Sequence, residues 1–266
     1  MLRTRVITAI ALLLVLLPAL FYLSPSLWIV AVVAVLMTAS WEWARLARLP
    51  AKAVWPFVLL TGSAGWLMQI SAPAAVRAGY GIALLFWLIA VPLMFLTARR
   101  PKGWLAALAG WCVLLPFGAA LVDLREMGPW RLLSVMALVW VADIAAYFAG
   151  RAFGVHKLAP AISPGKTWEG VAGAVLGVAL YLTVNVYFDN PLLSGESVWV
   201  LVAIVAVCLT MLSVLGDLFE SAMKRSAGMK DSSQLLPGHG GILDRVDALT
   251  STLPVTALLL IWSGKL

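Results

Sequence analysis

Charge and cysteine are both scarce in this sequence. Only 12% of its 266 residues are Asp, Glu, Lys or Arg, and 63% are apolar, whereas soluble domains have about a quarter charged residues and roughly half apolar ones. The scarcity of charge excludes an ordinary soluble domain and indicates an integral membrane protein. The two cysteines, Cys112 and Cys208, lie in separate apolar runs, which excludes a CxxC metal site and an exposed disulfide, so both are expected in the core.

The charge that is present is mainly basic. Lys and Arg number 19 against 12 Asp and Glu, which gives a net charge of +7. Basic residues of membrane proteins gather in cytoplasmic loops, so we expect membrane lipids as partners and no nucleic acid. The first apolar run, 6–22, lacks the small-x-small cleavage site of a signal peptide and is long enough to span a bilayer, so we expect it to remain as a helix.

The apolar runs predict an all-α integral membrane protein, a polytopic bundle of about nine transmembrane helices. Residues 1–125 are expected to form about five of these helices, and residues 126–266 a C-terminal region that carries the chemistry, with two long loops near 150–167 and 218–246. Turn-forming residues separate most runs. The predicted spans are 6–23, 27–41, 54–70, 79–98, 104–122, 130–149, 168–188, 197–217 and 247–263. Gly173 and Gly177 form a GxxxG pattern, which predicts close helix packing.

The basic residues alternate between successive loops. With a cytoplasmic N-terminus, the predicted inner segments hold most of the Lys and Arg residues. The predicted outer face holds only Arg77, Arg125, Arg131 and Lys265. The positive-inside rule therefore predicts that the N-terminus and both long loops face the cytoplasm.

The end of the eighth span combines polar groups with the edge of the hydrocarbon. Asp217 lies at this edge, where an unpaired carboxylate costs about 2.5–3.5 kcal/mol. Glu220, Ser221 and Lys224 follow at spacings of three and four, so a continuing helix would present all four side chains on one face. This spacing also fits an exposed helix end with salt bridges, but the position of Asp217 favours a functional site.

The loop that follows contains PGHGG at 237–241 and then two aspartates. Glycines allow close backbone approach and expose amide groups, as anion-binding loops require, although such a run is usually only a turn. Asp244 and Asp247 are three apart, so they share a helix face and repel each other unless a cation or a proton intervenes. We favour a divalent metal ion over simple charge at a helix N-terminus.

The other long loop contains SPGKTWEG at 163–170, directly before the seventh span. Its GKT is similar to the end of a Walker A motif, but Pro160 replaces the earlier glycine and no strand is expected before it, so we reject a P-loop. Lysine and hydroxyl groups beside a helix N-terminus are typical of a phosphate site. Asp143 lies within the sixth span, where a carboxylate indicates function. Together these groups are suited to a metal-bound polyphosphate beside a lipid headgroup.

Several blocks of the C-terminal half resemble the phosphatidate cytidylyltransferases, also called CDP-diacylglycerol synthases. These blocks are DIAAYF at 143–148, KLAP at 157–160, SPGKTWEG at 163–170, SAMKR at 221–225, KD at 230–231, LPGHGG at 236–241 and LDRVD at 243–247. Two departures are visible: Ile144-Ala145 stands where the family commonly has Thr-Gly, and Ala248 where it commonly has serine. The first five spans match only in hydropathy.

The resemblance implies condensation of CTP with phosphatidic acid to give CDP-diacylglycerol and pyrophosphate, with Mg²⁺ as cofactor. It also implies a homodimer in the cell inner membrane, with the active site facing the cytoplasm. We assign the metal to Asp217, Asp244 and Asp247. The catalytic set is Lys224, Arg225, His239, Arg245 and Asp231, and the substrate-binding set is Ser163, Lys166, Thr167, Asp143 and Lys230.

Two alternatives stay open at this point. In a CTP-dependent lipid kinase, the lipid would attack the terminal phosphorus of CTP. The by-product would then be CDP instead of pyrophosphate. A transporter of phosphorylated solutes would place charged groups or broken helices at mid-membrane, whereas the ionisable residues here cluster toward one face.

Overall fold

The computed structural model describes residues 2–71, 73–187 and 198–263, and these ranges are almost entirely helical. Helices α4, η1 and α5 form one continuous segment with a π-helical turn in its middle. The elements are α1 (Leu2–Tyr22), α2 (Pro25–Leu46), α3 (Ala51–Ser71), α4 (Pro73–Leu85), η1 (Phe86–Ala90), α5 (Val91–Thr97), α6 (Gly103–Glu126), α7 (Pro129–Phe153), β1 (Lys157–Ala159), β2 (Ser163–Thr167), α8 (Trp168–Tyr187), α9 (Val198–Ala227) and α10 (Leu243–Trp262).

The prediction of an all-α polytopic membrane protein is confirmed. Eight segments of the described chain are helical, long and apolar enough to cross a bilayer, and a shorter apolar helix covers Val6–Tyr22. Turn chemistry determines several boundaries: the Ser24 side chain accepts a hydrogen bond from the Leu27 amide at 3.3 Å at the start of α2, and Pro129 begins α7. The predicted span ends at 188 and 197 lie outside the described residues.

Two helices continue beyond the ends that hydropathy predicted. Helix α9 runs to Ala227, and α10 begins at Leu243, so the connecting loop is 228–242 and the predicted loop at 218–246 is too long. The added turns of α9 remain helical because one of their faces still packs in the core, with Phe219 against the ring of Trp87 at 5.5 Å between centroids. Similarly, α2 continues to Leu46 and includes Glu42.

A short antiparallel hairpin interrupts the helical fold after α7. Strand β1 pairs with β2, with Lys157 opposite Thr167 and Ala159 opposite Ser163. The expectation that no strand accompanies the GKT sequence is therefore wrong, since this sequence ends β2 itself. The hairpin fixes the backbone at 163–167 directly before α8.

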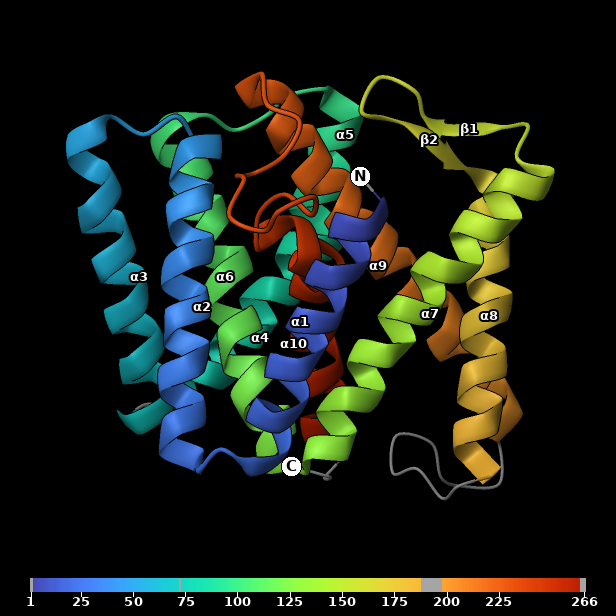
Figure 1. Ribbon diagram of the computed structural model, residues 1–266, viewed down its shortest axis with the longest axis horizontal. Coiled ribbons are helices and arrows are strands. Elements are labelled where there is room, and N and C mark those ends of the chain that lie inside the picture. The colour runs from blue at the N-terminus through green and yellow to red at the C-terminus, as the bar shows by residue number, and fades with distance from the viewer. Residues whose placement is uncertain (1, 72, 188–197, 264–266) are drawn as a thin grey trace.

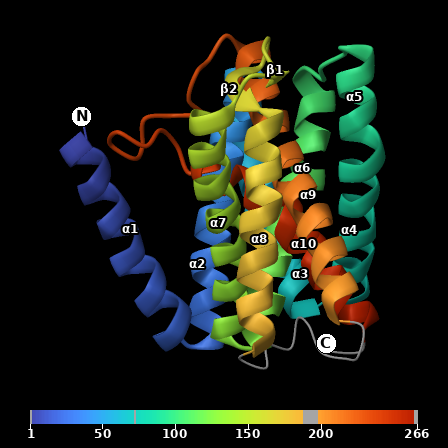
Figure 2. The same ribbon diagram turned by 90° about the vertical axis from the view of Figure 1, so that its right-hand side faces the viewer.

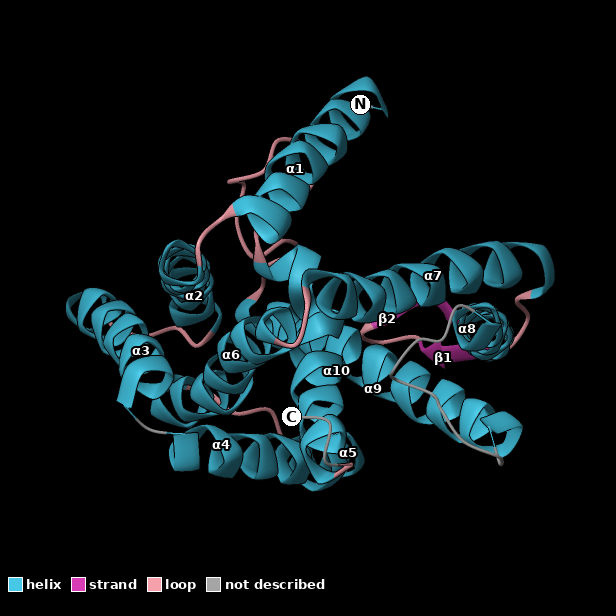
Figure 3. Cartoon of the chain, turned by 90° about the horizontal axis from the view of Figure 1, so that it is seen from below, coloured by secondary structure: helices cyan, strands magenta, loops and turns pink. Residues whose placement is uncertain are grey.

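Both long connections lie at one end of the bundle. Figure 1 shows the first residues of α1, the β1–β2 hairpin and the end of α9 at the same end, with α7, α8 and α9 grouped on one side of the molecule. Helix α10 runs through the centre, and α1 leans away from the other helices (Figure 2 and Figure 3). Helices α6 and α10 are the most enclosed, at 72% and 67% of their membrane-length windows.

Close packing of α7 against α8 depends on glycine, as the GxxxG pattern predicts. A Cβ atom at Gly173 would lie 2.2 Å from Cβ of Ala149, and one at Gly177 would lie 2.6 Å from Cβ of Ala145. These distances are shorter than any van der Waals contact, so the two helices can approach this closely only with glycine in α8. The prediction that Cys208 lies in the core is wrong, because this residue is exposed on α9.

Candidate active site

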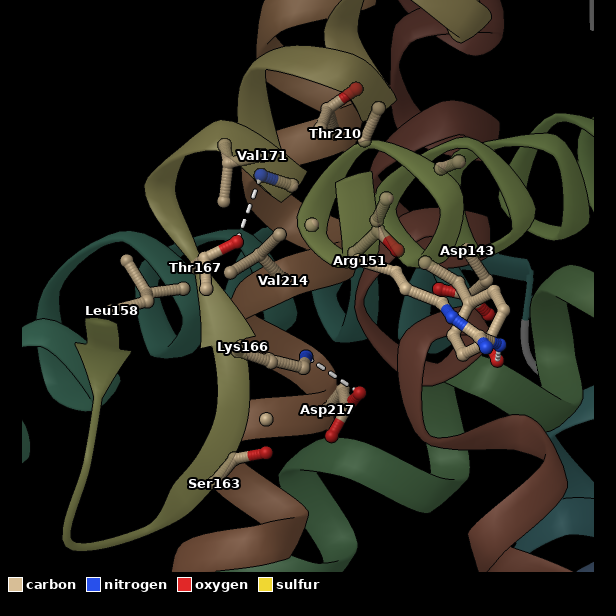
Figure 4. A pocket seen from close by; sticks show the side chains of 18 residues that line it. Asp143, Arg151, Leu158, Ser163, Lys166, Thr167, Val171, Thr210, Val214 and Asp217 are labelled. Carbon is tan, nitrogen blue, oxygen red and sulfur yellow. Dashed lines mark hydrogen bonds and ion pairs between the residues drawn. The ribbon is translucent and has the colours of Figure 1, made fainter. Parts of the chain in front are cut away.

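A cavity of about 530 Å³ lies among α7, α8, α9 and strand β2 (Figure 4). Small apolar residues of α7 and α8 line part of it, and polar residues come from β2 and from within α7 and α9. The predicted residues Asp143, Ser163, Lys166, Thr167 and Asp217 all line it. The structure thus brings together residues that the sequence placed in three separate segments.

An ion pair joins two walls of the cavity. Figure 4 shows Lys166 from β2 reaching Asp217 from α9, with 2.6 Å between Nζ and Oδ2. The other carboxylate oxygen of Asp217 accepts a hydrogen bond from the Ser221 hydroxyl at 3.1 Å. Asp143 enters from α7 and interacts electrostatically with both Lys166 and Asp217. A substrate phosphate in this cavity would meet the Lys166 amine and the Arg151 guanidinium, together with two carboxylates.

Thr167 ends β2 and directly precedes helix α8. Its buried hydroxyl accepts a hydrogen bond from the Gly170 amide at 3.1 Å, which satisfies one of the free amide groups at the helix start. Cβ atoms at Gly150 or Gly154 would lie 3.0 and 2.9 Å from this same hydroxyl oxygen. The predicted substrate-binding role of Thr167 therefore has to coexist with a structural role as a helix cap.

A second charged cluster centres on Lys224, about two helical turns beyond Asp217 on α9. Its Nζ lies 2.5 Å from Oδ1 of Asp244 and 3.2 Å from Oε2 of Glu220. All three side chains are enclosed, with 11%, 5% and 4% of their surfaces exposed, respectively. Burial of one ammonium with two carboxylates leaves a surplus of negative charge that the surroundings must offset.

The second oxygen of Asp244 is also fully engaged. Its Oδ2 accepts hydrogen bonds from the Ser232 amide, the Ser232 hydroxyl and the Gly241 amide, each at 2.8 Å. The glycine-rich loop was expected to offer its amides to an external anion. In this structure the Gly241 amide instead binds a carboxylate of the protein itself.

Asp247 lies beside Asp217 because α9 and α10 approach closely at Gly216. A Cβ atom at Gly216 would lie 2.7 Å from the carbonyl oxygen of Asp247 and 3.1 Å from Cα of Ala248. Asp247 interacts electrostatically with Asp217, Asp143 and Lys224.

The site region contains more acids than amines. Glu220 adjoins Asp247. Its Oε1 is buried without a hydrogen-bond partner among the described residues. Two neighbouring buried carboxylates need a shared proton or a cation between them. Within the described residues, however, no group of three or more His, Cys, Asp and Glu side chains is arranged to hold a metal ion. A divalent ion at Asp217 would have to displace Lys166, and one at Asp244 would have to displace Lys224. Asp247 forms no ion pair with Lys, Arg or His in the described part of the chain.

Comparison with known proteins identifies the family of this chain. The sequence model described as the cytidylyltransferase family matches residues 3–262. The chain belongs to the cytidylyltransferase family. A Haemophilus influenzae protein named phosphatidate cytidylyltransferase is 38% identical over 96% of both chains, and a Pseudomonas aeruginosa protein of the same name is 39% identical over 99% of this chain and 98% of the relative. A Staphylococcus saprophyticus protein, also of that name, is 42% identical over 53% of each chain.

The other predicted residues of this cytidylyltransferase-family chain lie around the cavity rather than in it. Arg225 is exposed and donates a hydrogen bond to the Ile162 carbonyl in the hairpin at 3.4 Å. Arg245 is exposed and interacts with Asp143. His239 lies in a tight turn, its amide bonded to the Leu236 carbonyl at 2.8 Å. Its ring Nδ1 is buried, without a hydrogen-bond partner in the described part of the chain.

Lys230 and Asp231 line a different cavity, of about 580 Å³, on the far side of the 228–242 loop. This second cavity is also lined by Arg45, which stacks over the Trp41 ring at 5.0 Å from its centroid. Lys230 and Asp231 are therefore separated from the predicted substrate residues Lys166 and Thr167. Their assigned roles stay predictions.

Sequence reasoning missed two groups of the cytidylyltransferase site region. Glu42 is fully buried and accepts hydrogen bonds from the 228–242 loop and from the start of α10. A signal existed, because Glu42 stands between two tryptophans at the end of an apolar run, but the predicted span ended one residue before it. Ser232, which is also buried, gave no signal in the sequence. Its role depends on its hydrogen-bond partners Glu42 and Asp244, which are distant from it along the chain.

Proposed function

We propose that this protein is a phosphatidate cytidylyltransferase, which transfers CMP from CTP to phosphatidic acid to give CDP-diacylglycerol and pyrophosphate. The observation that carries the proposal is similarity along almost the whole chain to two proteins of that name, at 38% and 39% identity. The charged cavity beside α7, α8 and α9 supports it, because a polar pocket in an otherwise apolar bundle suits a substrate with a phosphate head and acyl tails.

The reaction requires little acid–base chemistry from the protein. The phosphate of phosphatidic acid has a second pKa around 6 and is largely dianionic at neutral pH, so its oxygen attacks the α-phosphorus of CTP without a general base. The bond from this phosphorus to the pyrophosphate oxygen breaks, and pyrophosphate leaves. The difficulty is electrostatic, because two polyanions must meet. Lys166 and Lys224, with Arg225 and Arg245 near the cavity mouth, are the groups we assign to offset their charge.

Mg²⁺ is the proposed cofactor, and we assign Asp217 and Asp247, which interact electrostatically, to hold it. When bound, the ion would neutralise charge on the triphosphate and on the departing pyrophosphate. Asp244 would contribute mainly by holding Lys224, which lies 2.5 Å from it. His239, Lys230 and Asp231 remain second-rank candidates for contact with phosphates.

We further propose a multi-pass protein of the cell inner membrane that acts as a homodimer, with the cavity facing the cytoplasm. The support for this orientation is the distribution of Lys and Arg in the sequence, together with the position of both long connections at one end of the bundle.

The deciding experiment incubates purified protein with phosphatidic acid and CTP labelled at the α-phosphorus, with and without Mg²⁺. We expect labelled CDP-diacylglycerol and free pyrophosphate in equal amounts, and no product after chelation. Release of labelled CDP would instead identify a lipid kinase. Absence of any lipid product, combined with uptake of a phosphorylated solute into vesicles, would identify a transporter.

A further inference from the structure

Glu42 of α2 is a buried carboxylate in a part of the chain that has so far had no role in the site. It is 0% exposed, and among the described residues no Lys, Arg or His forms an ion pair with it. Burial of an unpaired carboxylate is unfavourable unless several hydrogen-bond donors replace the lost water. Glu42 has four such donors, one of which, the Ser232 hydroxyl, it shares with Asp244. All four belong to one segment near the other end of the chain.

The four donors divide evenly between the two carboxylate oxygens. Oε1 accepts from the Ser233 hydroxyl at 2.5 Å and from the Ile242 amide at 3.0 Å. Oε2 accepts from the Ser232 hydroxyl at 3.2 Å and from the Leu243 amide at 2.8 Å. Each oxygen thus receives one side-chain hydroxyl and one backbone amide. The two amides are those at the start of α10, where a negative charge also interacts favourably with the helix dipole.

The same segment carries the charged cluster. The Ser232 hydroxyl lies between Glu42 and Asp244, at 3.2 Å from one carboxylate and 2.8 Å from the other. Gly241 passes between these carboxylates, since a Cβ atom there would lie 2.2 Å from Oε1 of Glu42. The backbone that holds Oδ2 of Asp244 is therefore the backbone that Glu42 holds in place. In Figure 1 the 228–242 loop lies beside the upper part of α2 and leads into α10.

We propose that Glu42 is a positioning residue for the cytidylyltransferase site. Its carboxylate holds residues 232–243 in the conformation that presents Asp244 to Lys224 and that starts α10 with Asp247 beside Asp217. In the described part of the chain, the hydrogen bonds to Glu42 come from this segment and from none of the residues that line the first cavity. The inference rests on the proposed function, because positioning has a kinetic consequence only where the positioned carboxylates serve a reaction.

Glu42→Gln tests the proposal with an almost isosteric change. Whichever oxygen becomes an NH₂ group, it faces one backbone amide of α10, and an amide N–H cannot turn round to accept a hydrogen bond. A serine hydroxyl can. The Gln variant therefore has to move the start of α10. Glu126→Gln is the matched control, because Glu126 is exposed at the opposite end of the bundle.

Stability and kinetics are both measured in purified protein in detergent. The stability measurements are the melting temperature and the hydrogen–deuterium exchange of peptides covering 232–247 without added metal. The kinetic measurements are kcat, the KM for phosphatidic acid and the Mg²⁺ concentration for half-maximal activity. For Glu42→Gln we expect exchange at 232–247 at least tenfold faster, with α7 and α8 unchanged. We also expect kcat per folded molecule at least tenfold lower, a higher Mg²⁺ requirement and an unchanged KM for phosphatidic acid. Glu126→Gln should match the wild type in every measurement.

A merely structural role gives a different pattern, in which less protein folds but the folded fraction has wild-type kcat and Mg²⁺ requirement. That result overturns the proposal. If Glu42→Gln does not fold, Ser233→Ala is used instead, because it removes a single donor to Oε1. We then expect two- to fivefold changes in exchange, kcat and Mg²⁺ requirement, in the same directions. No change in these quantities would count against the proposal. A wild-type protein that makes no CDP-diacylglycerol refutes the proposed function instead, so the two failures are distinguishable.

Discussion

Asp217 and Asp244 carry the same chemical group in different surroundings. Asp217 lines the cavity, is 29% exposed and binds Lys166 and Ser221. Asp244 is only 5% exposed and binds Lys224, Ser232 and Gly241. A carboxylate on a cavity wall can meet a substrate or an ion directly. An enclosed carboxylate with this many donors also holds the fold together.

Replacement of each aspartate by asparagine should separate these contributions. We expect both variants to lose at least about 100-fold in turnover, as removal of a key electrostatic group does in other enzymes. Asp244→Asn should also cost about 1–3 kcal/mol of stability, because its amide group faces either Lys224 or three donors. Asp217→Asn should change stability by less than about 1 kcal/mol, since it also relieves repulsion from Asp143 and Asp247.

Turnover and thermal unfolding of the two purified variants provide the measurement. Equal loss of stability in both would contradict the distinction between them. Wild-type turnover in Asp217→Asn would remove this residue from the site.

At the residue scale, the sequence predicted those site residues that stand out against an apolar background. Asp143, Lys166 and Asp217 were recognisable because charge is costly there, and the structure brings them to one cavity. Glu42 carried the same kind of signal but lay one residue past the predicted span. Its partners Ser232 and Ser233 could not be predicted, because a serine hydroxyl gives no sign in the sequence of which distant carboxylate it binds.

At the scale of elements, the close packing of α7 against α8 forms one wall of the cavity. Gly173 lies in this contact, with no room for a side chain, whereas Gly81 in α4 has no atom within 4 Å of a Cβ atom placed on it. Both glycines are helical. Substitution of alanine at both positions therefore distinguishes the effect of crowding from that of intrinsic helix propensity.

Gly173→Ala should destabilise the protein by roughly 1–3 kcal/mol, because the helices must separate to admit the methyl group. Gly81→Ala should be neutral or stabilise the protein by up to about 1 kcal/mol, because alanine has the higher helix propensity. Thermal unfolding in detergent gives both values. A Gly173→Ala protein as stable as the Gly81→Ala protein would show that α7 and α8 are not packed as described.

Element boundaries were predictable where turn chemistry marks them and not where a helix leaves the apolar run. Pro129 begins α7 where Gly128-Pro129 predicted a break. The last turns of α9 are amphipathic, so hydropathy ended the span at 217 although packing of Phe219 continues the helix to Ala227. The β1–β2 hairpin was missed because its strands have three and five residues and little apolar periodicity.

At the scale of the whole molecule, the orientation in the membrane can be tested by labelling. Single cysteines are introduced at Lys157, Gln234 and Glu126 after Cys112 and Cys208 have been replaced. All three positions are exposed, the first two near the hairpin end and the third at the opposite end of the bundle. With the proposed orientation, a membrane-impermeant maleimide added to spheroplasts should label only position 126.

Inverted vesicles provide the control, where positions 157 and 234 should react and position 126 should not. The reverse pattern in both preparations would place the cavity mouth on the outer face. Labelling of all three positions from one side would contradict the arrangement of the helices.

The partners of Glu42 are separated from it by 190–201 positions along the chain. During biosynthesis α2 is complete when most of the polypeptide is still untranslated. A nascent or prematurely terminated chain that ends before residue 232 lacks all four of these donors. The hydrogen bonds that we propose to position the site therefore form only after nearly the whole chain has been made.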